Sequence, residues 1–478
     1  MLFLAITCMV MLNILSVLNY KSTGGGGGWQ NFYDMPKKTA DVVFFGSSHA
    51  HCTFDHGFLW DEYGIAGYTL SAGAQMIDCT YYFVKEAIEV HKPKVVVVEV
   101  WGAIHDQIVN SDESVYRNTL GLRWSKNHWE FVNDLVDHME RDSDYRKRLL
   151  AKIPVIHSRY AEVTKEDFEN IEPYMRGYRG SFERTVFETP NIIPAEEVAA
   201  LDARSEEYLR KIIDLVKESD TELVLAASPY LVSETDQRRF NRISQIAGQE
   251  GVPMINFNHL YDEMELDYSL DFRDEGHLNN YGARKVTSYL AGFLRENYEL
   301  SDKRGEEKYK LWDLNSRFLK GKEAEKVLWD AVSIHDYLKV VSELKEYVVI
   351  LMLNGNHTAA GDIYFPELER MGIDYDSYLA GGVWIFENGI QVEHIPGKEY
   401  KRDFEINKNS IYLKSEISMA EDGNNREEVE IVMDNRNYVL AENGVNILVY
   451  DPQTDLVIDS AGTDIFVNFD MIRADKRL

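Results

Sequence analysis

The chain has 478 residues, of which 45% are hydrophobic, and a formal net charge of −29. This length indicates two or three domains rather than one. The acidic balance argues against nucleic acid, and against an anionic membrane surface, as a partner, because both attract patches of Lys and Arg. The three cysteines, Cys8, Cys52 and Cys79, are too few for a disulfide framework, and no Cys-x-x-Cys spacing points to zinc.

The first apolar stretch covers residues 2–18, which carry no charged side chain. Its length is at the short end of what spans a membrane as a helix. Because the usual basic region and a small-residue cleavage site are missing, we expect an uncleaved signal anchor over residues 1–20, with a buried core helix as the alternative. The anchor would place the rest of the chain outside the cytoplasm, in the cell envelope. The glycine run at 24–28 predicts a flexible tether over residues 21–39.

Apolar runs with the length of strands come next, at residues 42–45, 95–100, 222–227 and 253–257. They are continuous rather than alternating, which is typical of strands buried on both faces. Apolar residues at helical spacing separate them, around residues 76–88, 208–216, 240–247 and 286–294. This alternation predicts an α/β domain over residues 40–298, with a parallel sheet between two layers of helices.

Residues 104–200 interrupt this rhythm, since they are charged, aromatic and mostly helical in pattern. We expect an insertion at the carboxyl end of the strand at 95–100, where α/β proteins bind ligands, and therefore a lid or a substrate wall. Residues 299–334 are highly charged and predict a linker with helical character. Residues 335–478 carry strand patterns separated by Asn-Gly and Asp-Gly turns, which predict a β-rich α+β domain.

A candidate nucleophile follows the first of these strands, in the stretch Gly46-Ser47-Ser48. A serine nucleophile needs a base within hydrogen-bond reach and a carboxylate that orients the base. Asp274 and His277, spaced Asp-x-x-His, precede the last helix of the α/β domain, at the same edge of a parallel sheet. We therefore predict that Ser48 is the nucleophile, His277 the base and Asp274 the orienting acid. Two alternatives stay open: Asp271 as the acid, and Asp274 as a helix cap.

Gly46-Ser47-Ser48 and Asp274-x-x-His277 together resemble the SGNH (GDSL) hydrolase superfamily over residues 40–298. Members that modify cell-wall polymers and exopolysaccharides, such as the D-alanine-transfer protein of teichoic acid synthesis, also show Gly-Ser-Ser. Ser47 departs from the usual Gly-Asp-Ser block. The resemblance implies a flavodoxin-like α/β/α fold, a Ser-His-Asp triad and no cofactor. It also implies acyl-ester hydrolysis or O-acyl transfer, most often of acetyl, on a cell-envelope or extracellular polysaccharide.

The same resemblance implies an oxyanion hole built from the backbone N–H groups of Ser48 and Gly73. Gly73 would stand just before a helix whose first amides help to hold negative charge. The family's third element, an asparagine in a Gly-x-Asn-Asp block, is missing, because Gly102 has no asparagine beside it. A slow hydrolase, an acyltransferase that excludes water and a degenerate enzyme all stay open.

Other residues near Ser48 also invite an interpretation. His49, His51, Asp55 and His56 raise the question of a metal site, but no third group of ligands supports one, so we expect no metal. Their expected roles are to line the cleft or to cap the next helix. Glu99, at the end of a strand, is expected to be a structural hydrogen-bond partner.

Gly444–Val449 and Val457–Ser460 resemble strands of the interleukin-like EMT inducer (ILEI, PANDER-like) domain, with a likeness that extends over residues 335–470. Related domains bind sugars, and a packing module without a ligand is the alternative. The expected partner is a carbohydrate polymer, joined by an integral-membrane O-acyltransferase if the chain transfers acyl groups. A catalytically inactive glycan-binding or assembly protein is the remaining alternative.

Overall fold

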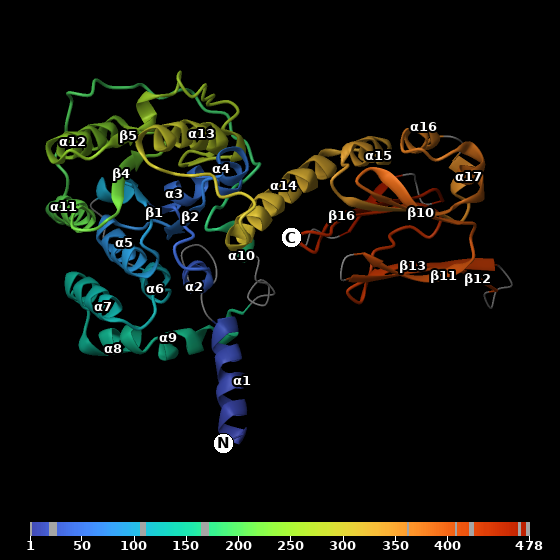
Figure 1. Cartoon of the computed structure of the whole chain (residues 1–478), viewed down its shortest axis with the longest axis horizontal. Helices are drawn as coiled ribbons and strands as arrows, with labels where there is room; N and C mark the ends of the chain where they lie inside the picture. The colour runs from blue at the N-terminus through green and yellow to red at the C-terminus, as the bar shows by residue number, and fades with distance from the viewer. Residues whose placement is uncertain are drawn as a thin grey trace. The chain divides into compact units, whose positions relative to one another are not determined.

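The computed structural model describes residues 2–18, 26–105, 111–163, 172–360, 363–406, 409–419, 425–466 and 470–474. These form two compact units, one up to Ser316 and one from Arg317 (Figure 1). The division falls within residues 299–334, the stretch expected to be a charged linker. Most of that stretch is a helix, α14 (Lys310–Asp330). Tyr309 and Trp312 are buried in the core of the first unit, so this part of the stretch is packed rather than free.

The first unit is built on a parallel sheet of five strands in the order β2-β1-β3-β4-β5. The strands are β1 (Val42–Gly46), β2 (Gly67–Ser71), β3 (Val95–Glu99), β4 (Glu222–Ala227) and β5 (Met254–Asn256). Every residue of β1, β2 and β3 is buried, which the continuous apolar runs predict for β1 and β3. Strand β2, with the sequence Gly-Tyr-Thr-Leu-Ser, has no such run and was not predicted. This strand order is that of flavodoxin-like folds, and the predicted α/β class is confirmed.

Helices cover both faces of the sheet. Alternate strand residues, among them Val43, Phe45 and Val96, pack with three helices: α5 (Ile77–His91), α11 (Ala203–Lys217) and α12 (Glu234–Glu250). Phe44 faces the other way, with its ring stacked 4.6 Å from that of Phe54. On that side α13 (Asn280–Asn297) packs against α3 (Ser48–Thr53) and α4 (His56–Tyr63). Because the helices lie on the two faces of the sheet, the carboxyl ends of its strands stay available for a binding site.

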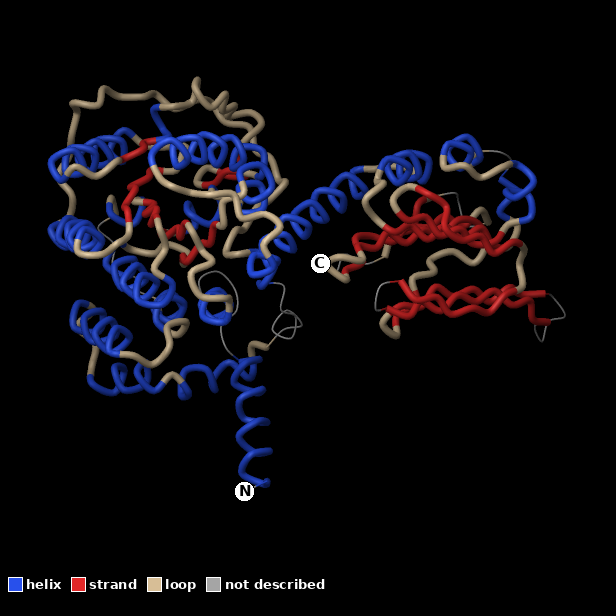
Figure 2. The backbone as a smooth tube through the Cα atoms, viewed as in Figure 1, coloured by secondary structure: helices blue, strands red, loops and turns tan. Residues whose placement is uncertain are grey.

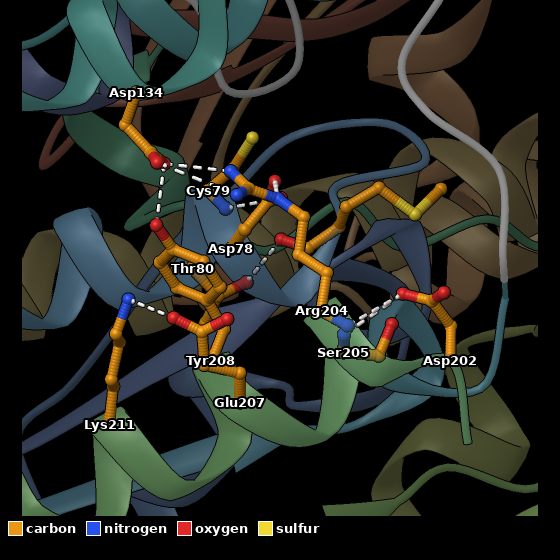
Figure 3. Close-up of polar contacts among 11 residues, drawn as sticks. Asp78, Cys79, Thr80, Asp134, Asp202, Arg204, Ser205, Glu207, Tyr208 and Lys211 are labelled. Atoms are coloured by element: carbon orange, nitrogen blue, oxygen red, sulfur yellow. Dashed lines mark hydrogen bonds and ion pairs between the residues drawn. The ribbon is translucent and has the colours of Figure 1, made fainter. Parts of the chain in front are cut away.

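The expected insertion is helical over much of its length. It contains α6 (Asp112–Thr119), α7 (Lys126–His138), α8 (Ser143–Ala151), α9 (Ile153–Ser158) and α10 (Glu172–Met175). Arg204 on α11 holds it in place, with ion pairs of 2.9 Å to Asp78 on α5 and 2.7 Å to Asp134 on α7. The Tyr208 hydroxyl also donates a 2.6 Å bond to Asp134 (Figure 3). The part from 178 to 202 has no helix or strand.

The N-terminal apolar stretch forms α1 (Leu2–Leu18). Among the described residues, no helix combines the length and the apolar character needed to cross a membrane. The flexible tether expected over 21–39 needs a correction: residues 21–25 lie outside the described part, but α2 (Gly26–Asp34) is a packed helix. Trp29 and Phe32 are buried in the core, and Tyr68 on β2 donates a 2.6 Å bond to the Gly28 carbonyl. Burial of these aromatic rings outweighs the flexibility of the glycines.

The second unit is β-rich, as predicted. Its six-stranded antiparallel sheet has the order β10-β9-β8-β15-β16-β17, and a four-stranded sheet has the order β11-β12-β13-β14. Figure 2 shows the two sheets as separate layers. The strands are β8 (Val348–Asn354), β9 (Gly382–Glu387), β10 (Ile390–Pro396), β11 (Tyr400–Ile406), β12 (Asn409–Met419), β13 (Asn425–Met433), β14 (Arg436–Asn437), β15 (Gly444–Asp451), β16 (Leu456–Asp464) and β17 (Met471–Arg473).

Strand β8 shows how this unit is layered, because its alternate side chains enter two different cores. Leu351 and Leu353 pack with α15 (Ile334–Glu343), α16 (Phe365–Arg370) and α17 (Tyr375–Ala380). Ile350 and Met352 pack against the four-stranded sheet. The six-stranded sheet therefore lies between helices and a second sheet.

Candidate active site

Ser48 is presented by a sharp strand-to-helix turn. Gly46, the last residue of β1, has φ +143°, and a Cβ there would lie 2.8 Å from the Cβ of Glu99. Any other residue at this position would be strained and would clash, so glycine is required. Ser47 then caps α3, its hydroxyl accepting a 3.3 Å bond from the His49 amide. Ser48 becomes the first residue of the helix at the carboxyl edge of the sheet, half-buried.

The structure brings the three predicted triad side chains together. His277 Nε2 lies 2.7 Å from Ser48 Oγ, and His277 Nδ1 lies 2.7 Å from Asp274 Oδ1. Asp274 and His277 stand on a small hairpin of β6 (Phe272–Asp274) and β7 (His277–Leu278). Asp274 also accepts bonds of 2.9 Å from the Gly276 amide and 3.0 Å from Arg273 Nε. The acid is therefore oriented by its own hairpin before it orients the histidine.

The structure gives other partners to the two open alternatives, Asp271 as the acid and Asp274 as a helix cap. Asn279, rather than Asp274, caps α13, accepting bonds from the amides of Tyr281 and Gly282. Asp271 is buried and paired with Lys285 at 2.7 Å. The carboxylate in contact with His277 is that of Asp274.

The charge state of the site suits a general base. Burial lowers the pKa of His277 below its ordinary value, against the opposing pull of Asp274. Burial alone would raise the pKa of Asp274, but the Gly276 amide, His277 and Arg273 outweigh it and hold that pKa low. His277 is therefore neutral at neutral pH beside a charged Asp274. With its Nδ1–H directed to Asp274, its Nε2 is free to accept the Ser48 proton.

Gly73, the second predicted oxyanion donor, lies in the turn after β2. Strand β2 pairs with β1 in parallel, with Ser71 opposite Gly46, so the turn stands beside the Ser48 turn. The expectation of a helix directly after Gly73 needs a correction, since α5 begins only at Ile77. The intervening Ala74 has φ 52°, and this left-handed turn separates Gly73 from the helix.

The third oxyanion block is replaced by a tightly packed turn. Trp101–Ala103 form a short 3₁₀ helix, and a Cβ on Gly102 would lie 2.2 Å from the Gln75 carbonyl oxygen. Gly102 therefore lets the turn after β3 close onto the turn after β2. No side-chain amide of this turn can act as the missing donor, because the turn carries none.

Arg117 on α6 is a residue that the sequence analysis did not single out. Its Nη1 lies 3.7 Å from the position that a Cβ on Gly73 would take. Its Nη2 pairs with Glu113, and its buried Nε has no hydrogen-bond partner among the described residues. The insertion thus brings a guanidinium group to the predicted oxyanion turn. Its place in a separate helix, 69 residues from Ser48, gives no local signal in the sequence.

Glu99 acts as the expected structural partner at the base of the site. Its carboxyl group accepts bonds of 3.0 Å from the Trp101 amide and 3.4 Å from the Ser47 hydroxyl. Burial raises its pKa to about 8, although these bonds pull in the other direction. A protonated Glu99 therefore ties the turn after β3 to the turn after β1 at neutral pH.

The histidines near Ser48 have separate partners. The ring of His49 lies 5.2 Å from that of Trp101, 4.8 Å from that of Tyr230 and 5.3 Å from that of His277. His51 Nδ1 lies 2.9 Å from Ser71 Oγ, and His56 Nε2 lies 2.7 Å from Thr69 Oγ1. Asp55 caps the N-terminus of α4 by accepting a bond from the Phe58 amide. His49 lines the triad, while His51 fixes α3 and His56 fixes α4 to strand β2, and Asp55 caps α4.

The last part of the insertion runs along the triad. The Arg179 amide donates a 2.7 Å bond to the His51 carbonyl on α3. Thr185 bonds the hairpin twice, from its amide to the Phe272 carbonyl at 2.9 Å and from its hydroxyl to the Arg273 carbonyl at 2.7 Å. This segment therefore joins the helix that carries Ser48 to the hairpin that carries Asp274 and His277, as a wall of the site would.

Comparison with known proteins adds little to this geometry. No protein-family model matches the chain, and no curated protein matches it. Eight solved chains match, among them a crystal structure of a candidate acylhydrolase from Bacteroides fragilis. That match has 12% sequence identity and a TM-score of 0.27, and it covers 56% of this chain and 93% of that one. At this level the likeness carries no argument about this chain.

Proposed function

We propose that the chain is a serine-dependent acyl-ester hydrolase or O-acyltransferase of the SGNH type. The observation that carries this proposal is the unbroken chain of 2.7 Å contacts from Ser48 through His277 to Asp274. A hydroxyl, a neutral imidazole and a carboxylate in this order are what nucleophilic catalysis requires. The family resemblance of Gly46-Ser47-Ser48 and Asp274-x-x-His277 supports two further parts of the proposal. The acyl carrier is a polysaccharide, most often acetylated, and the protein acts in the cell envelope.

In the proposed reaction Ser48 Oγ attacks the carbonyl carbon of a sugar O-acyl ester and its proton passes to His277 Nε2. The backbone amides of Ser48 and Gly73 hold the resulting oxyanion. As the ester bond breaks, the sugar hydroxyl leaves with the proton from His277, and the acyl group stays on Ser48. Water or a second sugar hydroxyl then gives its proton to His277, attacks the acyl group and releases Ser48. Asp274 orients His277 and stabilises its charged form throughout.

Arg117 is proposed as the replacement for the missing third donor. Its guanidinium stands beside Gly73, and its Nη1 is the atom nearest to a side chain that Gly73 would carry. A cation there would stabilise negative charge as the family's asparagine does by hydrogen bonding.

A fluorophosphonate probe, which reacts only with an activated serine, tests the catalytic claim. We expect labelling of the wild type, its loss in Ser48→Ala, and its survival in Ser47→Ala, the matched neighbour. An unlabelled wild type, or labelling that survives Ser48→Ala, would favour the alternative of an inactive glycan-binding or assembly protein.

A second experiment separates hydrolysis from transfer. The protein is incubated with an O-acetylated polysaccharide, with and without an unacetylated acceptor glycan. Free acetate that is independent of the acceptor indicates an esterase. Acetate that appears on the acceptor indicates a transferase.

A further inference from the structure

Helix α1 exposes apolar side chains to solvent along its length. Those of Phe3, Met9 and Ile14 are 79%, 64% and 52% exposed, and no charged residue interrupts the helix. Such a surface is costly in water and marks a site of contact with an apolar partner. What that partner is can be inferred from the part of the first unit that α1 touches.

Only the C-terminal end of α1 is packed against described residues of the unit. Leu15 and Leu18 lie against a small apolar cluster of Leu120, Val155 and Ile156, the last two on α9. Arg159, which follows α9, donates a 2.9 Å bond from Nη1 to the Leu18 carbonyl. Figure 1 shows α1 leaving the unit at the end of the row formed by α8 and α9. The base of α1 is therefore fixed to this row.

The same region carries large exposed side chains that no described residue covers. Trp124 is 63% exposed, Ile153 44% and Tyr160 70%. Trp124 is held in place rather than loose, since its indole N–H donates a 2.8 Å bond to the Leu150 carbonyl and the Lys152 ammonium lies 5.7 Å from its ring centre. We call these three residues the α9 patch.

Basic side chains flank the α9 patch. Lys147 and Arg148 on α8 are exposed, and the Arg148 guanidinium lies 5.4 Å from the ring centre of Tyr145. Lys147 pairs with Asp144 in an exposed ion pair, which constrains it little. Local positive charge beside exposed Trp and Tyr is unexpected on a chain whose net charge is −29. This composition is that of the boundary between lipid headgroups and acyl chains.

We propose that α1 and the α9 patch together form a lipid-binding surface, which lays the first unit against a bilayer that contains anionic phospholipid. Helix α1 contributes the apolar contact, Trp124, Ile153 and Tyr160 enter the headgroup boundary, and Lys147 and Arg148 meet the lipid phosphates. The attraction is therefore local, since it depends on these basic side chains and not on the net charge of the chain. This inference is independent of the catalytic proposal, because lipid contact needs neither Ser48 nor His277.

An environment-sensitive fluorophore tests the α9 patch in the full chain. The dye is attached at Ile153→Cys in a Cys8→Ser background, since Cys52 and Cys79 are buried. The matched control carries it at Val186→Cys, which is 71% exposed in the same unit. With vesicles of phosphatidylcholine and phosphatidylglycerol, we expect a blue shift and brighter emission at 153 and none at 186. Vesicle binding without a change at 153 would overturn the proposal, since α1 would then act alone.

Vesicle flotation tests the chemistry of the surface. The double variant Trp124→Ser/Tyr160→Ser is expected to bind vesicles more weakly than the wild type. The variant Lys147→Glu/Arg148→Glu is expected to lose about tenfold in binding to phosphatidylglycerol-containing vesicles and little to phosphatidylcholine alone. A shift at position 153 that follows protein concentration without vesicles would assign the surface to a second copy of the chain and contradict the proposal.

Discussion

The Nε2 atom of His277 lies 2.7 Å from the Oγ atom of Ser48, although 229 positions separate the two residues in the chain. A parallel sheet makes this possible, because the turn after β1 and the hairpin before α13 meet at the same edge. Two residues from elsewhere in the chain, one on a strand and one in a loop, hold the pair in place. Glu99 fixes the turn that presents Ser48, and Thr185 fixes the hairpin that presents His277.

Removal of the base or of its orienting acid tests the triad directly. In Asp274→Asn, the amide cannot hold the Nδ1–H tautomer of His277 in the same way, and we expect kcat for an aryl acetate to fall by about 10³–10⁴-fold. His277→Ala should be at least as damaging. Asp271→Asn, in which the altered carboxyl does not contact His277, is the control: its melting temperature will change, but a comparable loss of kcat there would argue against Asp274 as the acid.

The pH dependence of activity follows from the pKa of His277. Burial lowers this pKa, and the base works only when it is neutral. Activity is therefore expected to be full at neutral pH and to be lost as the pH falls, with a midpoint below 6.5, the ordinary value. Arg273 contributes to the lowering, so Arg273→Gln should move the midpoint upward. A wild-type midpoint above 6.5 in a kcat/KM profile would contradict this assignment.

The sequence predicted the parts of the first unit whose pattern is locally strong. The continuous apolar runs of β1, β3 and β4 and the Asp-x-x-His spacing are such patterns. The strands β10 and β11 were not predicted, because they expose most of their residues and contain no continuous apolar run. Their pairing is set by partner strands and not by their own hydrophobicity.

Other features depend on contacts that no local pattern records. The glycines of α2 predict a tether, but Trp29 and Phe32 find a buried site only once β2 and α5 are folded. Arg117 reaches Gly73 because helix α6 of the insertion lies beside the turn after β2, which is a long-range contact. The absence of a third oxyanion block could be predicted, whereas the residue that stands in its place could not.

The buried carboxyl of Glu99 predicts a stability that depends on pH. Its pKa rises from 4.5 to about 8 on folding, so between these values the folded chain holds a proton that the unfolded chain releases. This contribution is fully present below pH 4.5 and is lost as the pH rises through about 8. We expect Glu99→Gln, which keeps the shape without the charge, to show a smaller fall in melting temperature between pH 6 and 9 than the wild type. Equal slopes for the two proteins would mean that Glu99 is ionised in the fold.

The guanidinium of Arg117 is expected to act on the transition state rather than on folding. If its Nη1 helps to hold the oxyanion beside Gly73, then Arg117→Gln should lower kcat by about 10²-fold and leave KM nearly unchanged, because the charge develops only after attack. Arg117→Lys keeps a cation at a different geometry and should recover part of the loss. Arg123→Gln removes a more exposed cation that pairs with Glu86, and it serves as the matched control. A loss of kcat that is matched in Arg123→Gln, or that comes with a lowered melting temperature, would assign Arg117 to the packing of the insertion instead.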